Sequence, residues 1–246
     1  MTAPSALAAL VAAPGSRVGG TYAQGAAYVF TRSGSSWSQQ AKLTVSDRAV
    51  QDLFGAALAL SGDTALVGNS PLGDHPAQSA AYVFVRAGTR WHQQAKLTAP
   101  EKTAYGFGDP VALSGDTALV AAPEAAFGRF FSQGSTYVYT RSAGVWSQRA
   151  KLTVSDRRDV GGLGQAIALS GRTALVGAVT DASDPPSNKP GAAYVFWLGP
   201  TAALPAGSSG GGATLAIIGS AAGILVIVVA SWLGLRRISA RRRVSQ

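Results

Sequence analysis

Short apolar runs separated by turn residues follow one another along most of the chain, and the clearest set occupies residues 56–60, 64–68, 80–85 and 91–98. Each run has the length of a β-strand, and none continues into the longer 3.6-residue period of an amphipathic helix. In the fourth run the odd-numbered positions are more apolar than the even-numbered ones. We therefore expect the odd-numbered residues from Trp91 to Leu97 to lie on one face of a strand.

The pattern repeats about every 55 residues. A tyrosine within an apolar run marks each copy, at Tyr28, Tyr82, Tyr137 and Tyr194. A tryptophan follows nine residues after each of the first three, at Trp37, Trp91 and Trp146. Four antiparallel strands in a repeat of this length form the blade of a propeller. The sequence therefore predicts an all-β fold and excludes the helical repeat classes.

Turn chemistry supports this interpretation. The first two strands of the middle copies are joined by Ser-Gly-Asp at 61–63 and 114–116, and those of the last copy by Ser-Gly-Arg at 170–172. Glycine supplies the positive φ that a tight hairpin needs. We expect a tight hairpin at each of the three places.

Two further signals stand at fixed places in the repeat. Phe54-Gly55 precedes Ala-Leu-Val-Gly at 65–68, and Phe107-Gly108 precedes Ala-Leu-Val-Ala-Ala-Pro at 118–123. These residues resemble FG-GAP repeats, the blade motif of integrin α-subunit propellers and of many bacterial surface proteins. The third copy is degenerate, with Leu163-Gly164 in place of Phe-Gly. The resemblance covers residues 7 to about 198. It implies a β-propeller displayed outside the cell for adhesion or protein recognition.

The predicted strands are distributed as three, four, four and three over successive copies, which gives about 3.5–4 blades in residues 1–198. A ring of four blades is near the lower limit for propellers. The alternatives are a fragment of a longer propeller and half of a ring formed by two chains. No signal peptide is visible, because no Lys or Arg precedes the short apolar run at the N-terminus. A start site placed too late in a longer reading frame would explain both features.

The composition changes after residue 198. Residues 199–212 are rich in Gly, Ser and Pro and predict a flexible tether. Residues 213–235 carry no charge and are long enough to cross a hydrocarbon core about 30 Å thick as a transmembrane helix. A basic tail, 236–246, follows with arginines at Arg236, Arg237, Arg241, Arg242 and Arg243.

This basic tail sets the expected orientation. By the positive-inside rule the tail lies in the cytoplasm, so we expect a single-pass protein of the cell membrane with its N-terminal region extracellular. Trp232 lies where an interfacial aromatic anchor is expected. Residues 204–207, Leu-Pro-Ala-Gly, are similar to a cell-wall sorting signal but lack its Thr-Gly cleavage pair, which favours retention in the membrane. Gly219 and Gly223 offer a close contact through which two membrane helices could form a homodimer.

The net charge of +9 at first suggests a nucleic-acid partner. Removing the five tail arginines from the 21 basic residues leaves 16 against 12 acidic ones, which is an ordinary surface. We therefore expect no nucleic-acid partner, and we expect the tail to contact the lipid bilayer. The lack of cysteine excludes disulfide scaffolds and thiol catalysis.

No residue pattern points to catalysis. The chain has two histidines, and no set of residues has the spacing of a metal cluster or a catalytic triad. Integrin-type repeats often carry an Asp-rich calcium loop between the first two strands, but here that connection is Ser-Gly-Asp or Ser-Gly-Arg. One carboxylate cannot supply the six to eight oxygens that calcium takes. We expect no cofactor and no calcium in these hairpins.

Ligand binding is expected in the loops between the second and third strands, which differ in every copy, at 15–25, 69–79, 124–135 and 180–191. The most ligand-like cluster lies in the third of these loops and consists of Phe127, Arg129, Phe130 and Phe131. The expected function is adhesion or binding of an extracellular protein or glycan, without catalysis. The alternatives are a surface glycan hydrolase or lyase with acidic residues in a central channel, and a truncated fragment of a longer FG-GAP protein.

Overall fold

The structure is a computed structural model of the chain. It describes residues 8–20, 22–46, 52–70, 79–125, 133–154, 161–179 and 191–199, together with the backbone of 227–229. Within these ranges every regular element is a β-strand, so the predicted all-β class is confirmed for the part of the chain that the structure describes.

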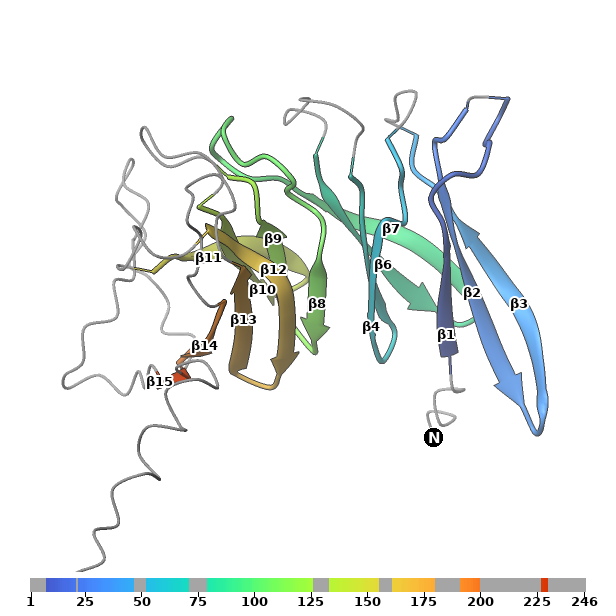
Figure 1. Cartoon of the computed structure of the whole chain (residues 1–246). Coiled ribbons are helices and arrows are strands. Elements are labelled where there is room, and N and C mark those ends of the chain that lie inside the picture. The colour runs from blue at the N-terminus through green and yellow to red at the C-terminus, as the bar shows by residue number, and fades with distance from the viewer. Residues whose placement is uncertain are drawn as a thin grey trace, which may run out of the picture.

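The strands form four antiparallel sheets, which we call blades 1 to 4 and which follow one another along an arc (Figure 1). Blade 1 consists of β1 (Ala8–Ala13), β2 (Ala26–Ser33) and β3 (Ser36–Leu43). Blade 2 consists of β4 (Ala57–Ser61), β5 (Thr64–Gly68), β6 (Ala81–Ala87) and β7 (Arg90–Leu97). Blade 3 consists of β8 (Val111–Ser114), β9 (Thr117–Ala122), β10 (Ser135–Ser142) and β11 (Val145–Leu152). Blade 4 consists of β12 (Gly161–Ser170), β13 (Thr173–Val179), β14 (Ala192–Trp197) and β15 (Ile227–Val229).

Up to residue 199 the strands are distributed as three, four, four and three over the described ranges, as the repeat predicts. The three predicted hairpins are confirmed as well. Their glycines, Gly62, Gly115 and Gly171, have φ values of 56°, 54° and 54°. Blades 1 and 4 lie at opposite ends of the arc, and each hydrophobic cluster of the described residues joins two consecutive blades (Figure 1).

The predicted transmembrane segment is described at three residues. There the backbone of Ile227–Val229 is extended and pairs with β14, in register with Val195 to Ala193, so these three residues are not helical in this structure. β-Branched residues fit a strand, and the outer edge of a three-stranded blade offers unpaired backbone groups. The rest of the span, the tether and the basic tail, with Trp232 and the five arginines, lie outside the described residues, as do Gly219 and Gly223. Among the described residues no helix has the length and hydropathy of a membrane span.

A β-bulge breaks the alternation that the sequence predicts in the outer strand. On β7, Ala95 pairs with Val83 but Gln93 pairs with Phe84, so Gln94 is the extra residue. One extra residue reverses which face the following side chains occupy. Trp91 therefore lies on the face of Phe84, opposite Ala95 and Leu97, and the expected single face is wrong. The same shift occurs in β3 and β11.

As a result, each blade has two unlike faces. The face toward the preceding blade, here called the aromatic face, carries Tyr82, Phe84 and Trp91 in blade 2. The face toward the next blade, here called the aliphatic face, carries Leu66 and Val83 in the same blade. In blades 2 and 3 both rows of side chains are buried, because each of these two blades packs against a neighbouring blade on both sides. The core is thus a series of junctions between blades.

The Phe-Gly turn closes the first two junctions, and Leu163-Gly164 takes its place in the third. Phe54 is fully buried and packs edge-on against Tyr82, with ring centroids 5.6 Å apart. Phe107 does the same with Tyr137 at 5.4 Å. Gly108 has a φ of 107°, and a Cβ there would lie 2.6 Å from the backbone oxygen of Ala80 in the preceding blade. Glycine is therefore needed for conformation and for the close approach of two backbones.

Replacing Gly108 by alanine tests this requirement. We expect G108A to lower the free energy of unfolding by about 2–4 kcal/mol, because it adds a clash with Ala80 to an unfavourable φ. The control is G88A in the β6–β7 hairpin, where φ is 63° and no atom lies within 4 Å of the added Cβ. That variant is expected to lose about 1 kcal/mol. Urea unfolding of the full chain in mild detergent measures both, and equal losses would contradict the junction role of Gly108.

Candidate functional site

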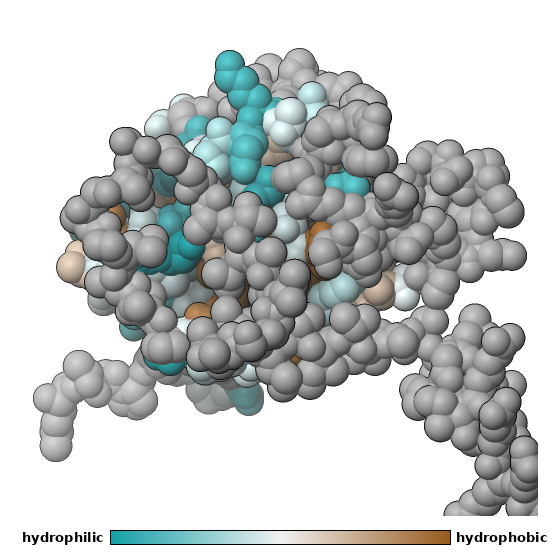
Figure 2. Space-filling model, turned by 90° about the vertical axis from the view of Figure 1, so that its left-hand side faces the viewer, coloured by the Kyte–Doolittle hydropathy of each residue, from teal (hydrophilic) through white to brown (hydrophobic). Residues whose placement is uncertain are grey.

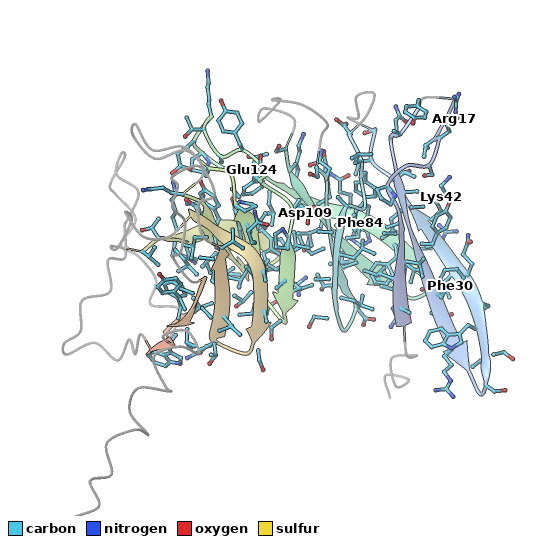
Figure 3. The ribbon with its side chains drawn as sticks, in the orientation of Figure 1. Arg17, Phe30, Lys42, Phe84, Asp109 and Glu124 are labelled. Atoms are coloured by element: carbon cyan, nitrogen blue, oxygen red, sulfur yellow. The ribbon has the colours of Figure 1, made fainter. Side chains whose placement is uncertain are left out.

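The two ends of the blades differ in structure. Hairpins such as β4–β5 and β6–β7 gather at one end, which we call the hairpin end (Figure 1). The strand ends that lead into the connections between the second and third strands, and into those between consecutive blades, lie at the opposite end, which we call the loop end. Figure 3 shows Arg17 and Glu124, from blades 1 and 3, at the loop end.

The hairpin end is tied together by bonds between corresponding turns. The Ser61 hydroxyl accepts a hydrogen bond from the backbone N–H of Gly115 at 3.0 Å, and Ser114 accepts one from Gly171 at 3.0 Å. Each serine thus bonds the glycine of the next hairpin. These bonds use side chains and backbone groups that a ligand would otherwise contact.

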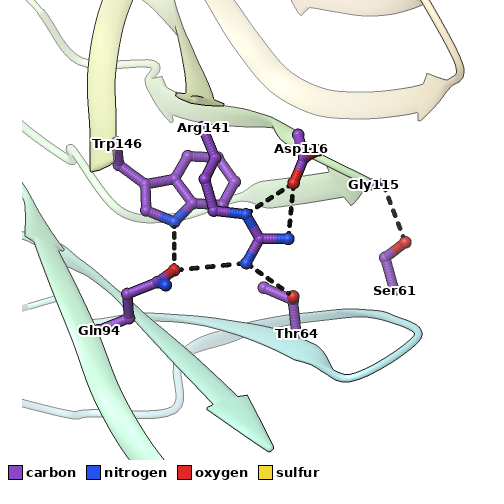
Figure 4. A network of polar contacts seen from close by, with 7 residues as sticks. All are labelled: Ser61, Thr64, Gln94, Gly115, Asp116, Arg141 and Trp146. Atoms are coloured by element: carbon purple, nitrogen blue, oxygen red, sulfur yellow. Dashed lines mark hydrogen bonds and ion pairs between the residues drawn. The ribbon is translucent and has the colours of Figure 1, made fainter. Parts of the chain in front are cut away.

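A larger polar network joins blades 2 and 3 at this end (Figure 4). The Arg141 guanidinium donates to Asp116 Oδ1 at 2.6 Å within blade 3. Its Nη1 reaches across to Thr64 Oγ1 at 3.2 Å and Gln94 Oε1 at 3.3 Å in blade 2. The indole N–H of Trp146 donates to the same Gln94 oxygen at 2.8 Å. The bulge residue Gln94 is thus the acceptor through which blade 3 is fixed to blade 2, and Trp91 makes the equivalent bond to Gln40 at 2.9 Å.

These contacts occupy the single carboxylate of each Ser-Gly-Asp hairpin. Asp63 is paired with Arg86, and Asp116 with Arg141. Within the described ranges no three His, Cys, Asp or Glu residues gather in a way that could hold a metal ion. The described contacts at the hairpin end thus join neighbouring turns to one another.

The loop end presents a basic and an aromatic side chain to solvent. In the β1–β2 loop, the Arg17 guanidinium lies 5.5 Å from the ring centre of Tyr22, and Tyr22 is 55% exposed. The base of this loop is closed by a hydrogen bond of 3.1 Å from the Gly25 N–H to the Ser16 carbonyl. A fixed base below an exposed cation–π pair is a geometry that suits ligand contact.

The other described loop bases are closed in similar ways. Asn69 is buried, and its side-chain oxygen accepts the Ala80 N–H at 2.6 Å, across the base of the β5–β6 loop. The Gly134 N–H donates to the Ala125 carbonyl at 3.2 Å, across the base of the β9–β10 loop. Each loop therefore starts and ends at a fixed point of the scaffold.

A charged cluster lies at the loop end between blades 2 and 3. Glu101, in the β7–β8 connection, accepts hydrogen bonds from Tyr137 Oη at 2.8 Å and Lys151 Nζ at 3.0 Å. Burial alone would raise the pKa of Glu101, but the bonds from Tyr137 and Lys151 outweigh it, so the pKa lies below its ordinary value. Burial, together with the bond to Glu101, raises the pKa of Tyr137. The cluster is a polar part of the junction.

Partial burial also raises the pKa of Asp109, which follows the Phe107-Gly108 turn and is half-buried (Figure 3). Glu124, by contrast, is exposed at the loop end. Among the described residues, Asp109 belongs to no group of three or more His, Cys, Asp or Glu side chains that could hold a metal ion.

The predicted ligand cluster of Phe127, Arg129, Phe130 and Phe131 lies outside the described residues, in the β9–β10 loop. The structure places Arg17 and Tyr22 together at the loop end, and neither residue was predicted from the sequence as a site residue. The signal for them was available, since both lie in the 15–25 loop that was expected to bind ligand. Glu101 was missed because its partners are 36 and 50 residues away.

The repeat itself matches a known family model. The model described as FG-GAP repeat matches residues 37–84, 91–139 and 146–196, more than half of the chain. The chain belongs to the FG-GAP repeat family. Each match begins at the tryptophan of one blade's outer strand and ends on the third strand of the next blade. One family unit therefore runs from the outer strand of one blade, through the turn between blades, to the third strand of the next blade. No curated protein matches the chain significantly.

Protonation of Glu101 provides a test of the charged cluster. Because the folded-state pKa is depressed, its stabilisation is present above the unfolded pKa of about 4.3 and is lost as pH falls through the lower folded value. We expect E101Q to be less stable than the native chain by only about 1 kcal/mol at pH 7, because solvent at the partly exposed Glu101 weakens its ion pair with Lys151. The difference should shrink as pH approaches 3. Urea unfolding at several pH values measures it, and E124Q, at an exposed acid of the same end, is the control. A deficit that does not change with pH would contradict the ionic role.

Proposed function

We propose that this FG-GAP repeat protein is anchored in the cell membrane and binds an extracellular protein or glycan with its loop end, without a catalytic step. The observation that supports this proposal is the contrast between the two ends of the blades. The hairpins keep almost the same sequence and bond to one another, whereas the loops differ in every copy and rise from fixed bases. Variable loops on a rigid scaffold are where binding residues concentrate.

The chemistry of the described loop end suits a polar ligand with apolar parts. Arg17 supplies a planar cation with several donors, and Tyr22 supplies an exposed ring with a hydroxyl. Phe127, Phe130 and Phe131, with Arg129, repeat this combination in the third loop of the sequence. Arginine with aromatic side chains is enriched at protein interfaces, and aromatic rings also stack on sugars.

Substitution of the loops tests the binding proposal. The native full chain, in lipid nanodiscs, is passed over an array of immobilised glycans and extracellular-matrix proteins. We expect binding to at least one class. We also expect the variant R17A/Y22A, combined with alanine at Phe127, Arg129, Phe130 and Phe131, to bind at least tenfold more weakly.

The matched control carries T89A and R90A at the tip of the β6–β7 hairpin, at the opposite end of the blade. It should bind like the native chain. Binding that survives the loop substitutions, or that is lost in the hairpin variant, would contradict the assignment to the loop end. No binding to any member of the array would contradict the proposed function.

The anchor is proposed from the sequence. Residues 213–235 are uncharged over the length of a membrane span and are followed at once by five arginines. Pairing of Ile227–Val229 with β14 and insertion of this segment into a bilayer are alternatives for the same residues. An experiment on membrane topology separates them.

The absence of cysteine makes such an experiment direct. In cells that express the full chain, S208C and S245C place single thiols on the two sides of the proposed span. We expect a membrane-impermeant maleimide to label S208C on intact cells and S245C only after permeabilisation. Equal labelling of both, or release of the chain from membranes by alkaline carbonate, would contradict the anchor.

A further inference from the structure

Inside the array, aromatic faces pack on aliphatic faces. At its two ends, one face of each kind is uncovered. No described residues form a blade before blade 1, so the aromatic face of blade 1 is exposed to solvent. Val11 and Trp37 on this face are 49% and 47% exposed, and Tyr28 and Phe30 are half-buried. Figure 3 shows Phe30 at the outer end of the array, whereas its counterpart Phe84 lies between blades.

Blade 4 has the opposite surface open. Its aliphatic face carries Leu175, which is 44% exposed, together with the exposed Ala168 and the half-buried Val195. Figure 2 looks onto this end of the molecule and shows hydrophobic residues in brown among atoms drawn in grey.

Strand register shows that these positions are covered elsewhere in the array. Val11 pairs with Tyr28 as Val67 pairs with Tyr82, and Val67 is 0% exposed. Leu175 pairs with Val195 as Leu119 pairs with Val138, and Leu119 is 0% exposed.

Every junction inside the array joins one aromatic face to one aliphatic face. In the middle junction, the valine of one blade and the leucine of the preceding blade, Val120 and Leu66, belong to the same buried cluster. The last junction repeats this with Val176 and Leu119. Val11 and Leu175 are therefore the two halves of a junction that the described chain does not form.

We propose that a second copy of this chain covers both surfaces. The aromatic face of blade 1 of each copy packs on the aliphatic face of blade 4 of the other. Such head-to-tail contacts form a closed ring when the rotation is completed. Two copies bring eight blades, within the range of about four to eight blades that propeller rings contain.

The symmetry of such a ring is compatible with a membrane. Its two-fold axis is the axis of the ring, so both copies present their loop ends in the same direction and both chains leave on the same side. Two tethers can then reach one bilayer. This compatibility rests on the proposed anchor, but the ring contact itself does not.

Cysteine cross-linking in the full-length chain tests the contact. The native chain has no cysteine, and both positions are exposed in the single chain, so V11C and L175C introduce thiols without changing the core of one copy. The chain is oxidised in lipid nanodiscs with a copper catalyst and run on a non-reducing gel. We expect the V11C/L175C double variant to give a covalent dimer as its main product. Neither single variant alone should do so, and a mixture of the two single variants should.

Three results would overturn the proposal. A disulfide within one chain would show that four blades close on themselves. A ladder of species larger than a dimer would show an open filament. No cross-link in the double variant would show that the two faces do not meet.

A second measurement separates this contact from pairing of the membrane segments. The mass of the chain in detergent, corrected for bound detergent, should be that of two copies, and L175K should raise the dimer dissociation constant at least tenfold. G219L/G223L should leave the dimer intact. A native chain of single mass, or a dimer that survives L175K and is lost in G219L/G223L, would contradict the ring.

Discussion

The fold depends on one repeated contact, in which the aromatic face of each blade packs on the aliphatic face of the blade before it. Tyr82 and Phe84 of blade 2 share a buried cluster with Val29 of blade 1, and Tyr137 and Tyr139 of blade 3 share one with Val83 of blade 2. Because no blade buries both of its faces alone, the stability of the array comes from junctions between neighbours, as in other repeat proteins.

The other features of the repeat serve this junction. The bulge at Gln94 turns Trp91 onto the aromatic face and leaves the Gln94 amide free to accept the bond from Trp146 of the next blade. The Phe-Gly turn fills the junction with an aromatic ring and lets the backbone of Gly108 approach the preceding blade. With the scaffold fixed in this way, the loops can differ in sequence without loss of the fold, which is the arrangement that the proposed binding function needs.

The strands, the hairpins and the division into blades could be predicted from the sequence because they depend on local signals. Ser-Gly-Asp or Ser-Gly-Arg marks the hairpin between the first two strands of a copy, and the spacing of Tyr82 and Tyr137 indicates the length of the repeat. The two unlike faces could not be predicted, because they depend on a bulge that leaves the alternation of side chains looking regular between Trp91 and Leu97. Contacts such as Trp146 with Gln94 join residues 52 positions apart, and no local pattern reveals them. The predicted ligand cluster and the anchor fall largely outside the described residues.

The most direct test of the junction is a comparison of one substitution at two equivalent sites. Leu119 and Leu175 occupy the same position of β9 and β13, but a following blade covers only the first, which is 0% exposed against 44% for the second. The free energy of unfolding of L119A and L175A is measured by urea titration at a protein concentration where the chain is monomeric. If neighbouring blades supply the stability, L119A should lose about 2–4 kcal/mol and L175A less than about 1 kcal/mol. Equal losses would show that each blade is stabilised within itself and would contradict this account.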